Sequence, residues 1–216
     1  MQKNHIIIKF FKIICIFIAI VFTTAYGFAQ NNASYHSNGQ IKEKGDTLAN
    51  GSKNGIWTFY YANGQASSIE NYSNGELEGK VTYYDTLGNI SAMENWSDGL
   101  LEDSAYYYYP NGEIKKKGIY KMGAYEGMWK FYDDNGIITR AGHYKWGLPE
   151  GLWQYYDAKG KLASEGNFTN GKESGEWKYF RKNGTLEYSG LYENGERKAP
   201  WYYYNKKGKK FEIEAE

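Results

Sequence analysis

The side chains that most often carry out chemistry in proteins are scarce in this sequence. Two histidines, His36 and His143, follow residue 29, and they fall at unrelated positions of the repeat described below. The only cysteine, Cys15, lies in the N-terminal segment, so no thiol nucleophile or cysteine metal site follows it. The glycines recur at turn positions and do not open helices, which argues against a phosphate-binding loop.

Three aspartates recur with fixed spacing just before predicted turns: Asp85, Asp133 and Asp157. Aspartate in this position caps the turn backbone. A row of such carboxylates is too sparse for calcium, which takes about six to eight oxygen ligands. Glu70 and Glu94 replace a glycine of later repeats and are expected to be surface charges. The sequence therefore predicts no catalytic residue, no metal site and no cofactor, and the protein is not expected to be an enzyme.

Tyrosine is abundant, at 23 of 216 residues, and four tyrosines are consecutive from Tyr106 to Tyr109. Their meaning depends on a repeat of 24 residues. Its units begin at about 30 and then at 55, 79, 103, 127, 151, 175 and 199. We number the positions of each unit as slots 1 to 24. A fixed period of this length is typical of a repeat architecture.

Glycine recurs at slots 10 and 21, often after Asn or Asp, as in Asn63-Gly64 and Asn170-Gly171. Such pairs favour turns with positive φ. The segments between them are rich in Tyr, Trp, Phe and Ile, which favours strands. The predicted fold is all-β, an elongated, twisted array of stacked β-hairpins over residues 30–216. Its core is expected at slots 3, 5, 12 and 18.

Two sets of tyrosines remain once this core is assigned. Slots 4 and 7 are mostly polar, so Tyr61, Tyr106, Tyr109 and Tyr202 are aromatic residues that the repeat does not require, and they form a candidate protein-binding surface. The alternative is that tyrosine simply suits strand surfaces.

Slot 6 is aromatic throughout and has the opposite parity to slots 3 and 5. The residues of this candidate aromatic ladder are Tyr60, Tyr84, Tyr108, Tyr132, Tyr156, Phe180 and Tyr204. Outward-facing rings about 10 Å apart would suit stacked sugars. A structural row, with tyrosine packed on tyrosine between units, is the other interpretation.

The first 29 residues have the layout of a signal peptide. Lys3, Lys9 and Lys12 precede an apolar run at residues 13–22, and cleavage is predicted after Ala29. Removing this segment leaves 23 basic and 25 acidic residues, a net charge of −2. A near-neutral surface gives no reason to expect nucleic acid, and no membrane insertion is expected after cleavage. Retention of the segment as an anchor is the alternative.

The stretches YSNGELEG (residues 72–79) and FTNGKESG (residues 168–175) resemble the centre of MORN repeats. The following Gly-x-Trp-x-[Tyr/Phe]-Tyr pattern resembles the variant MORN repeat of bacterial proteins, including YwqK-type antitoxins. The resemblance covers residues 35–208. It implies a β-hairpin array that serves as a scaffold or binding surface.

The expected function is a non-catalytic protein-binding or scaffolding module, secreted or periplasmic in a bacterial envelope. Another protein is the expected partner, and polysaccharide is the alternative, bound through the slot-6 ladder. A third hypothesis is an antitoxin or immunity protein that blocks a toxin.

Overall fold

The computed structural model describes residues 30–214, so the predicted signal peptide lies outside the described residues. Within that range all regular structure is β-strand. The strands are β1 (Gln30–Tyr35), β2 (Ile41–Thr47), β3 (Lys53–Tyr60), β4 (Ala66–Ser73), β5 (Glu76–Leu77), β6 (Gly79–Tyr84), β7 (Ile90–Ser97), β8 (Leu100–Leu101), β9 (Asp103–Tyr108), β10 (Ile114–Lys121), β11 (Ala124–Tyr132), β12 (Ile138–Lys145), β13 (Leu148–Tyr156), β14 (Leu162–Thr169), β15 (Lys172–Phe180), β16 (Leu186–Glu193), β17 (Glu196–Tyr204) and β18 (Lys210–Ile213).

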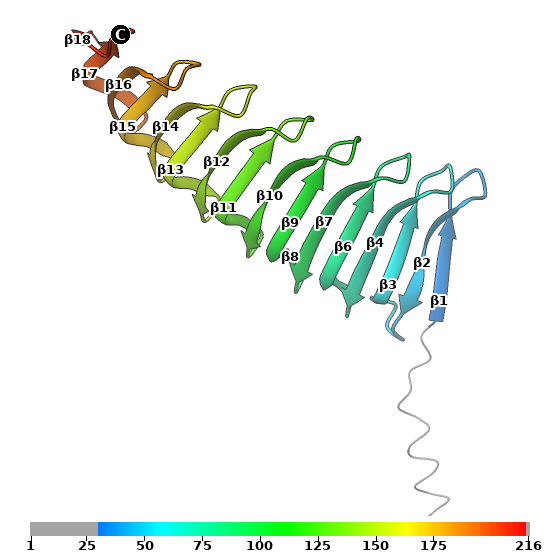
Figure 1. Cartoon of the computed structure of the whole chain (residues 1–216). Coiled ribbons are helices and arrows are strands. Elements are labelled where there is room, and N and C mark those ends of the chain that lie inside the picture. The colour runs from blue at the N-terminus through cyan, green and yellow to red at the C-terminus, as the bar shows by residue number, and fades with distance from the viewer. Residues whose placement is uncertain (1–29, 215–216) are drawn as a thin grey trace, which may run out of the picture.

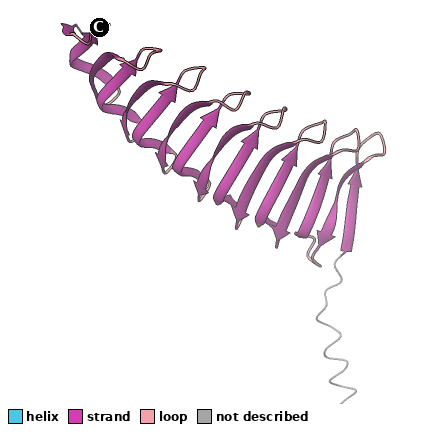
Figure 2. Ribbon diagram, viewed as in Figure 1, coloured by secondary structure: helices cyan, strands magenta, loops and turns pink. Residues whose placement is uncertain are grey.

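The strands form one open antiparallel sheet in which neighbours in the chain are neighbours in space. β1 pairs with β2, β2 with β3, and this order continues to β17 and β18. β5 and β6 form one interrupted strand that pairs with β4. β8 and β9 form another, which pairs with β7. The hairpins lie side by side in an elongated ribbon that twists along its length (Figures 1 and 2). The predicted all-β array of hairpins is confirmed.

Two kinds of turn lie at opposite edges of the ribbon. Glycines at slot 10 have φ between 73° and 88°, including Gly160 at 73°. At slots 20 and 21 two consecutive residues have positive φ, as at Asn170 (50°) and Gly171 (79°), which is the pattern of a type I′ turn. Met122 and Trp146 hold slot 20 in two units with φ of 50° and 51°, a conformation that bulky side chains rarely adopt.

The core of the sheet is the slot-3 row. Its residues are at most 4% exposed and are Trp57, Val81, Ala105, Trp129, Trp153, Trp177 and Trp201. Each indole lies against a slot-16 glycine of the preceding strand. A Cβ on Gly142 would come within 2.2 Å of the Trp153 ring, so only glycine fits there. The Trp153 indole N–H donates to the carbonyl of His143 at 3.0 Å, next to a register shift in the pairing.

The predicted core is wrong for slot 12. Leu162 pairs with Tyr156 of slot 6, whereas Ser164 pairs with Tyr155 of slot 5, so one extra residue is inserted between the two pairs. This β-bulge breaks the alternation that a regular strand would have. Slot 12 therefore pairs with slot 6 and does not continue the slot-18 row.

Candidate functional site

The sheet has two faces that differ in chemistry. We call the side that carries slots 3, 5, 14, 16 and 18 the tryptophan face, because the register pairs slot 3 with slot 16 and slot 5 with slot 14. We call the side that carries slots 2, 4, 6, 15 and 17 the reverse face. Neither face is covered by a second layer of the described chain (Figure 1). Both are therefore candidate binding surfaces.

On the tryptophan face, the residue type at slot 16 of one unit changes together with the residue type at slot 3 of the next unit. Wherever slot 16 is glycine, slot 3 of the next unit is tryptophan, as with Gly166 and Trp177. Where slot 16 is Glu70 or Glu94, the next slot 3 is Val81 or Ala105. The smaller slot-3 side chain leaves space that the glutamate occupies. The two glutamates are therefore part of the packing of this face.

Glu94 is 8% exposed, so the expectation that it is a surface charge is wrong. Its carboxylate accepts hydrogen bonds from the Tyr107 hydroxyl at 2.6 Å and from the Trp96 indole N–H at 3.2 Å. Glu70 is half-buried and accepts from the Ser68 hydroxyl at 2.7 Å and the Tyr72 hydroxyl at 2.6 Å. Buried carboxylates need such donors, because burial removes the water that would otherwise solvate the charge.

A row of tyrosines connects Glu94 to a lysine. The hydroxyl of Tyr107 also lies 3.0 Å from that of Tyr120, whose ring centroid is 5.0 Å from that of Tyr125. The ammonium of Lys116 donates to the Tyr125 hydroxyl at 2.6 Å. Burial raises the pKa of Tyr107, and the hydrogen bond to Glu94 raises this pKa further. Burial is also the main reason for the raised pKa of Tyr120. The hydroxyls of Tyr107 and Tyr120 are therefore neutral donors at ordinary pH.

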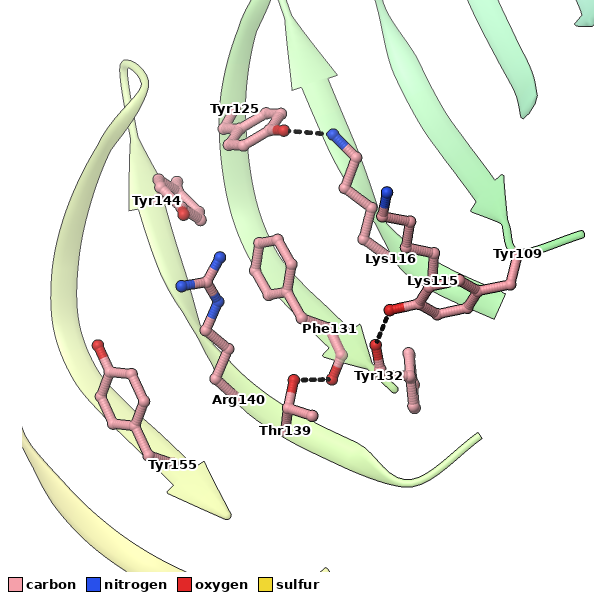
Figure 3. A pocket seen from close by; sticks show the side chains of 10 residues that line it. All are labelled: Tyr109, Lys115, Lys116, Tyr125, Phe131, Tyr132, Thr139, Arg140, Tyr144 and Tyr155. Carbon is pink, nitrogen blue, oxygen red and sulfur yellow. Dashed lines mark hydrogen bonds between the residues drawn. The ribbon is translucent and has the colours of Figure 1, made fainter. Parts of the chain in front are cut away.

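Beyond Lys116, the tryptophan face opens into a groove of about 660 Å³. We call it the basic groove, and its lining residues are Tyr109, Lys115, Lys116, Tyr125, Phe131, Tyr132, Thr139, Arg140, Tyr144 and Tyr155 (Figure 3). Lys116 and Arg140 both occupy slot 14. The Arg140 guanidinium lies 4.3 Å from the Phe131 ring centroid, and the Lys116 ammonium lies 4.0 Å from that of Tyr107.

Two tyrosines of the predicted binding surface have a structural role that the sequence reasoning missed. The Tyr61 hydroxyl donates to the Tyr84 carbonyl at 2.7 Å, and the Tyr109 hydroxyl donates to the Tyr132 carbonyl at 2.9 Å. Both bonds join slot 7 of one unit to slot 6 of the next. Tyr61 and Tyr109 therefore connect neighbouring turns.

The aspartates at slot 7 bind their own turn. Asp157 accepts from the backbone N–H groups of Lys159 at 2.8 Å and Lys161 at 3.0 Å, and hydrogen bonds from these groups lower its pKa. Asp85 and Asp133 make the equivalent pairs of bonds. The predicted capping role is confirmed. Within residues 30–214 no group of three His, Cys, Asp or Glu residues is placed to hold a metal.

Tyr106 lies on the reverse face, in a different setting. It pairs with Met93 on one side and Lys117 on the other. It lines two hollows, of about 300 Å³ towards Met128 and about 200 Å³ towards Lys80. Tyr106 is thus a half-buried aromatic residue between two open depressions.

Tyr202 also occupies slot 4, four units away from Tyr106, which corresponds to roughly 40 Å of sheet. The Lys210 ammonium lies 3.3 Å from its ring centroid. The structure therefore does not gather the four predicted tyrosines into one patch.

The slot-6 rings lie on the reverse face and are all half-buried. Among the described residues no ring contact joins two of them, whereas slot-3 and slot-5 rings contact one another repeatedly, as Trp153 and Tyr155 do at 6.2 Å. Individual rings have other neighbours. The Tyr156 hydroxyl donates to Gln154 at 3.0 Å, and Lys117 lies 5.8 Å from the Tyr132 ring.

The histidines have separate positions. His36 occupies slot 7 of the first unit, and its Nε2 lies 2.9 Å from the Tyr60 carbonyl, so it links two units as Tyr61 and Tyr109 do. His143 is exposed on β12. Glu94, Lys116 and Arg140 were not singled out from the sequence as a site. The paired change at slots 3 and 16 was the signal that could have found Glu94.

The MORN repeat variant model matches residues 53–74, 104–122, 125–145, 149–170 and 173–194. This chain is a MORN-repeat protein of the variant type. Each matched segment of the MORN-repeat chain contains one slot-10 turn with its two flanking strands and ends before the slot-21 glycine. No protein of known annotation matches the chain significantly.

Solved structures share only limited similarity with this MORN-repeat protein. A GtfA/B complex bound to UDP and GlcNAc matches 51% of this chain and 22% of its own, with 11% identity and a TM-score of 0.23. The TcdB2-TccC3-Cdc42 structure matches 83% of this chain and 12% of its own, with 16% identity and a TM-score of 0.23. A Photorhabdus luminescens Tc holotoxin pore matches 81% of this chain and 13% of its own, with 12% identity and a TM-score of 0.19. The chain thus spans less than a quarter of these structures.

Proposed function

We propose that this MORN-repeat protein is a non-catalytic binding module of the bacterial envelope that holds a partner protein on its reverse face around Tyr106. The observation that supports this proposal is the position of Tyr106 between two hollows. Tyrosine combines a large apolar area with a polar end, and it is favoured in the centre of protein interfaces.

The residues around Tyr106 suggest the chemistry of the partner. Met93, Ile119 and Met128 supply apolar surface, and Ile119 and Met128 are 46% and 42% exposed. Methionine adapts its shape to a partner because its side chain is unbranched and flexible. An apolar segment of the partner would fill the hollows beside the tyrosine ring.

Three lysines surround this surface: Lys80, Lys117 and Lys130. In the units that begin at 79, 103 and 127, slots 2, 4, 6, 15 and 17 hold no acidic residue. Glu94 also lines the hollow towards Lys80, and its carboxylate accepts hydrogen bonds from Tyr107 and Trp96 on the tryptophan face. The carboxylates of Glu102 and Glu126 lie at the turns, where they accept the backbone N–H groups of Met122 and Trp146. The positive charge favours a partner segment that carries acidic residues beside apolar ones.

Export is part of the proposal and rests on the sequence of residues 1–29, which has the signal-peptide layout. Residues 30–216 contain no cysteine, so the array needs no disulfide in an oxidising compartment. Among residues 30–214 no helix is long and apolar enough to span a membrane.

Site-specific photo-crosslinking in the native cell tests the partner surface. A photo-reactive phenylalanine analogue replaces Tyr106 in one variant and Lys178 in a control variant, because both residues occupy slot 4 of the reverse face. We expect one defined protein adduct from position 106 and none from position 178. Fractionation of the same cells locates the protein. The same adducts from both positions, or none from 106, would overturn the protein-binding proposal.

A second candidate function is carbohydrate binding along the slot-6 row. It is favoured by the absence of ring contacts between neighbouring slot-6 residues of the described chain, which leaves part of each ring free to stack on a sugar. Titration with neutral oligosaccharides, followed by intrinsic fluorescence, would detect it. Loss of binding in Tyr156→Ser with no loss in Tyr155→Phe would assign binding to the reverse face.

A further inference from the structure

Three cations line the basic groove on the tryptophan face, namely Lys115 and the slot-14 residues Lys116 and Arg140, and none of them has an acidic partner among residues 30–214. Among residues 30–214, ion pairs form at Lys53–Glu43, Lys178–Glu176, Arg181–Glu187 and Lys198–Glu196, and none of them involves Lys116 or Arg140. Among the described residues, the Lys116 ammonium donates a hydrogen bond to the Tyr125 hydroxyl at 2.6 Å and to no carboxylate. Arg140 is exposed and packs on Phe131. Both positive charges are therefore available to an anionic ligand.

The two cations are regularly spaced. Lys116 and Arg140 occupy slot 14 of consecutive units, on β10 and β12, which places their backbones about 10 Å apart across the sheet. Each lies beside slot-5 rings: Lys116 pairs with Tyr107 and Phe131, and Arg140 pairs with Phe131 and Tyr155. Positive charge and aromatic surface thus alternate along the groove.

The groove is suited to a ligand that binds without forming main-chain hydrogen bonds to the sheet. β10, β11, β12 and β13 are paired on both sides, so an extended peptide could not add to the sheet here. A saccharide binds instead by stacking its apolar ring surface on aromatic side chains and by pairing its charged groups. The volume of about 660 Å³ is within the usual range of small-ligand sites.

We propose that the basic groove binds an acidic oligosaccharide, with sugar carboxylates paired to Arg140 and Lys116 and sugar rings stacked on Phe131 and Tyr155. Arg140 presents the planar donor pair that matches a carboxylate. Carboxylates on alternate sugars would match the spacing of about 10 Å between the backbones that carry the two cations. This site is on the opposite face from Tyr106 and does not depend on the proposed protein interface.

Calorimetric titration of the purified chain tests the proposal with three probes of equal length. These are a hexameric uronate oligosaccharide, its fully methyl-esterified counterpart and hexaglutamate. We expect the uronate oligomer to bind, with an affinity that falls as salt increases. We expect the methyl ester, which keeps the sugar rings and loses the charge, to bind at least about tenfold more weakly. Hexaglutamate is expected to bind more weakly than the uronate oligomer as well.

Two variants locate the binding. Arg140→Gln is expected to weaken uronate binding about tenfold or more, and its exposed position leaves the fold intact, which circular-dichroism melting checks. Lys130→Gln, which removes one charge from the reverse face, is the matched control and is expected to bind like the parent. The proposal is overturned if the parent does not bind the uronate oligomer, binds the ester equally well or prefers hexaglutamate. Equal weakening in both variants would also overturn it.

Discussion

The units that begin at residues 55 and 79 and those that begin at 127, 151 and 175 pack the same face in different ways. In the later units an indole lies on a glycine, as Trp177 does on Gly166. In the earlier units Glu70 and Glu94 take the glycine position, and hydroxyl or indole groups bind their carboxylates. One backbone repeat therefore accepts either an apolar or a polar interior.

The difference extends to the backbone. In the later units the indole N–H donates to the slot-17 carbonyl, at 3.0 Å for Trp153. In the earlier units this donor is missing, and the slot-17 carbonyls of Asn71 and Asn95 accept the N–H groups of Glu78 and Glu102 at 2.9 Å. The strand is interrupted at Glu78 in one unit and at Glu102 in the next. A carbonyl inside a sheet needs a donor, and in these two units a backbone N–H takes the place of the indole where the strand is interrupted.

The two kinds of packing also differ in the charge that they carry on the tryptophan face. The buried carboxylate of Glu94 lies at one end of the tyrosine row, and Lys116 lies at the other. The basic groove begins where the glutamates end and the glycine–tryptophan pairs resume. Local packing thus decides where along a uniform repeat a charged ligand could bind.

The largest expected effect comes from exchanging the two kinds of packing. Gly166→Glu should destabilise the protein by at least about 3 kcal/mol, because a Cβ at this position would lie 2.1 Å from the Trp177 ring. Trp177→Val alone should cost about 3 kcal/mol by leaving a cavity. The double variant restores the residue types of the Glu70–Val81 pair and keeps a serine donor at Ser164, although Phe168 replaces the tyrosine donor, so its cost should be smaller than the sum by about 1–3 kcal/mol. Urea unfolding measures all three, and strict additivity would contradict the proposed exchange.

An intermediate effect is expected at alkaline pH. The pKa values of Tyr107 and Tyr120 are raised by burial, with Glu94 adding to the rise for Tyr107, so folding favours their neutral forms. The contribution of these tyrosines to the free energy of unfolding should be fully present below a pH of about 10, the pKa of tyrosine in the unfolded chain. Above that pH the free energy of unfolding should fall by up to about 1.4 kcal/mol per pH unit for each tyrosine. Urea midpoints measured across this range test the prediction. Tyr107→Phe should reduce the slope, and an unchanged slope would count against it.

The smallest expected effect concerns the turns, which both regions share. Tyr109→Phe removes the hydrogen bond to the Tyr132 carbonyl and should cost about 0.5–1.5 kcal/mol in unfolding free energy. Tyr106→Phe is the matched control, because within residues 30–214 no hydrogen bond involves the Tyr106 hydroxyl, and it should leave stability unchanged. Equal losses in the two variants would show that the unit-to-unit bond contributes nothing.

Most of the fold could be predicted from single residues at fixed spacing. The slot-10 and slot-21 glycines predicted the turns, because positive φ is a property of the local backbone. The tryptophan row followed from alternation along a strand. The slot-12 prediction failed because the bulge before Ser164 shifts the register, and a shift of one residue moves a side chain to the other face.

The candidate sites were less predictable. Tyr61 and Tyr109 were expected to be surplus surface residues, yet their hydroxyls reach carbonyls 23 residues further along the chain. Glu94 was expected to be exposed, and its burial depends on Ala105 being too small to fill the space beside it. Such contacts join residues of neighbouring units, so the pattern within one unit does not show them, and only the paired change at slots 3 and 16 pointed to Glu94.

The sequence by itself determined the repeat, the turns, the β-class and the row of buried tryptophans, because these depend on backbone preferences and on side-chain alternation within one strand. Only the tertiary structure decided which face each polar residue occupies and which partner it meets. Arg140 and Lys116 are ordinary charged residues in the sequence. Their shared groove exists because antiparallel pairing brings slot 14 of successive units onto one face two strands apart, with the slot-5 ring of Phe131 between them.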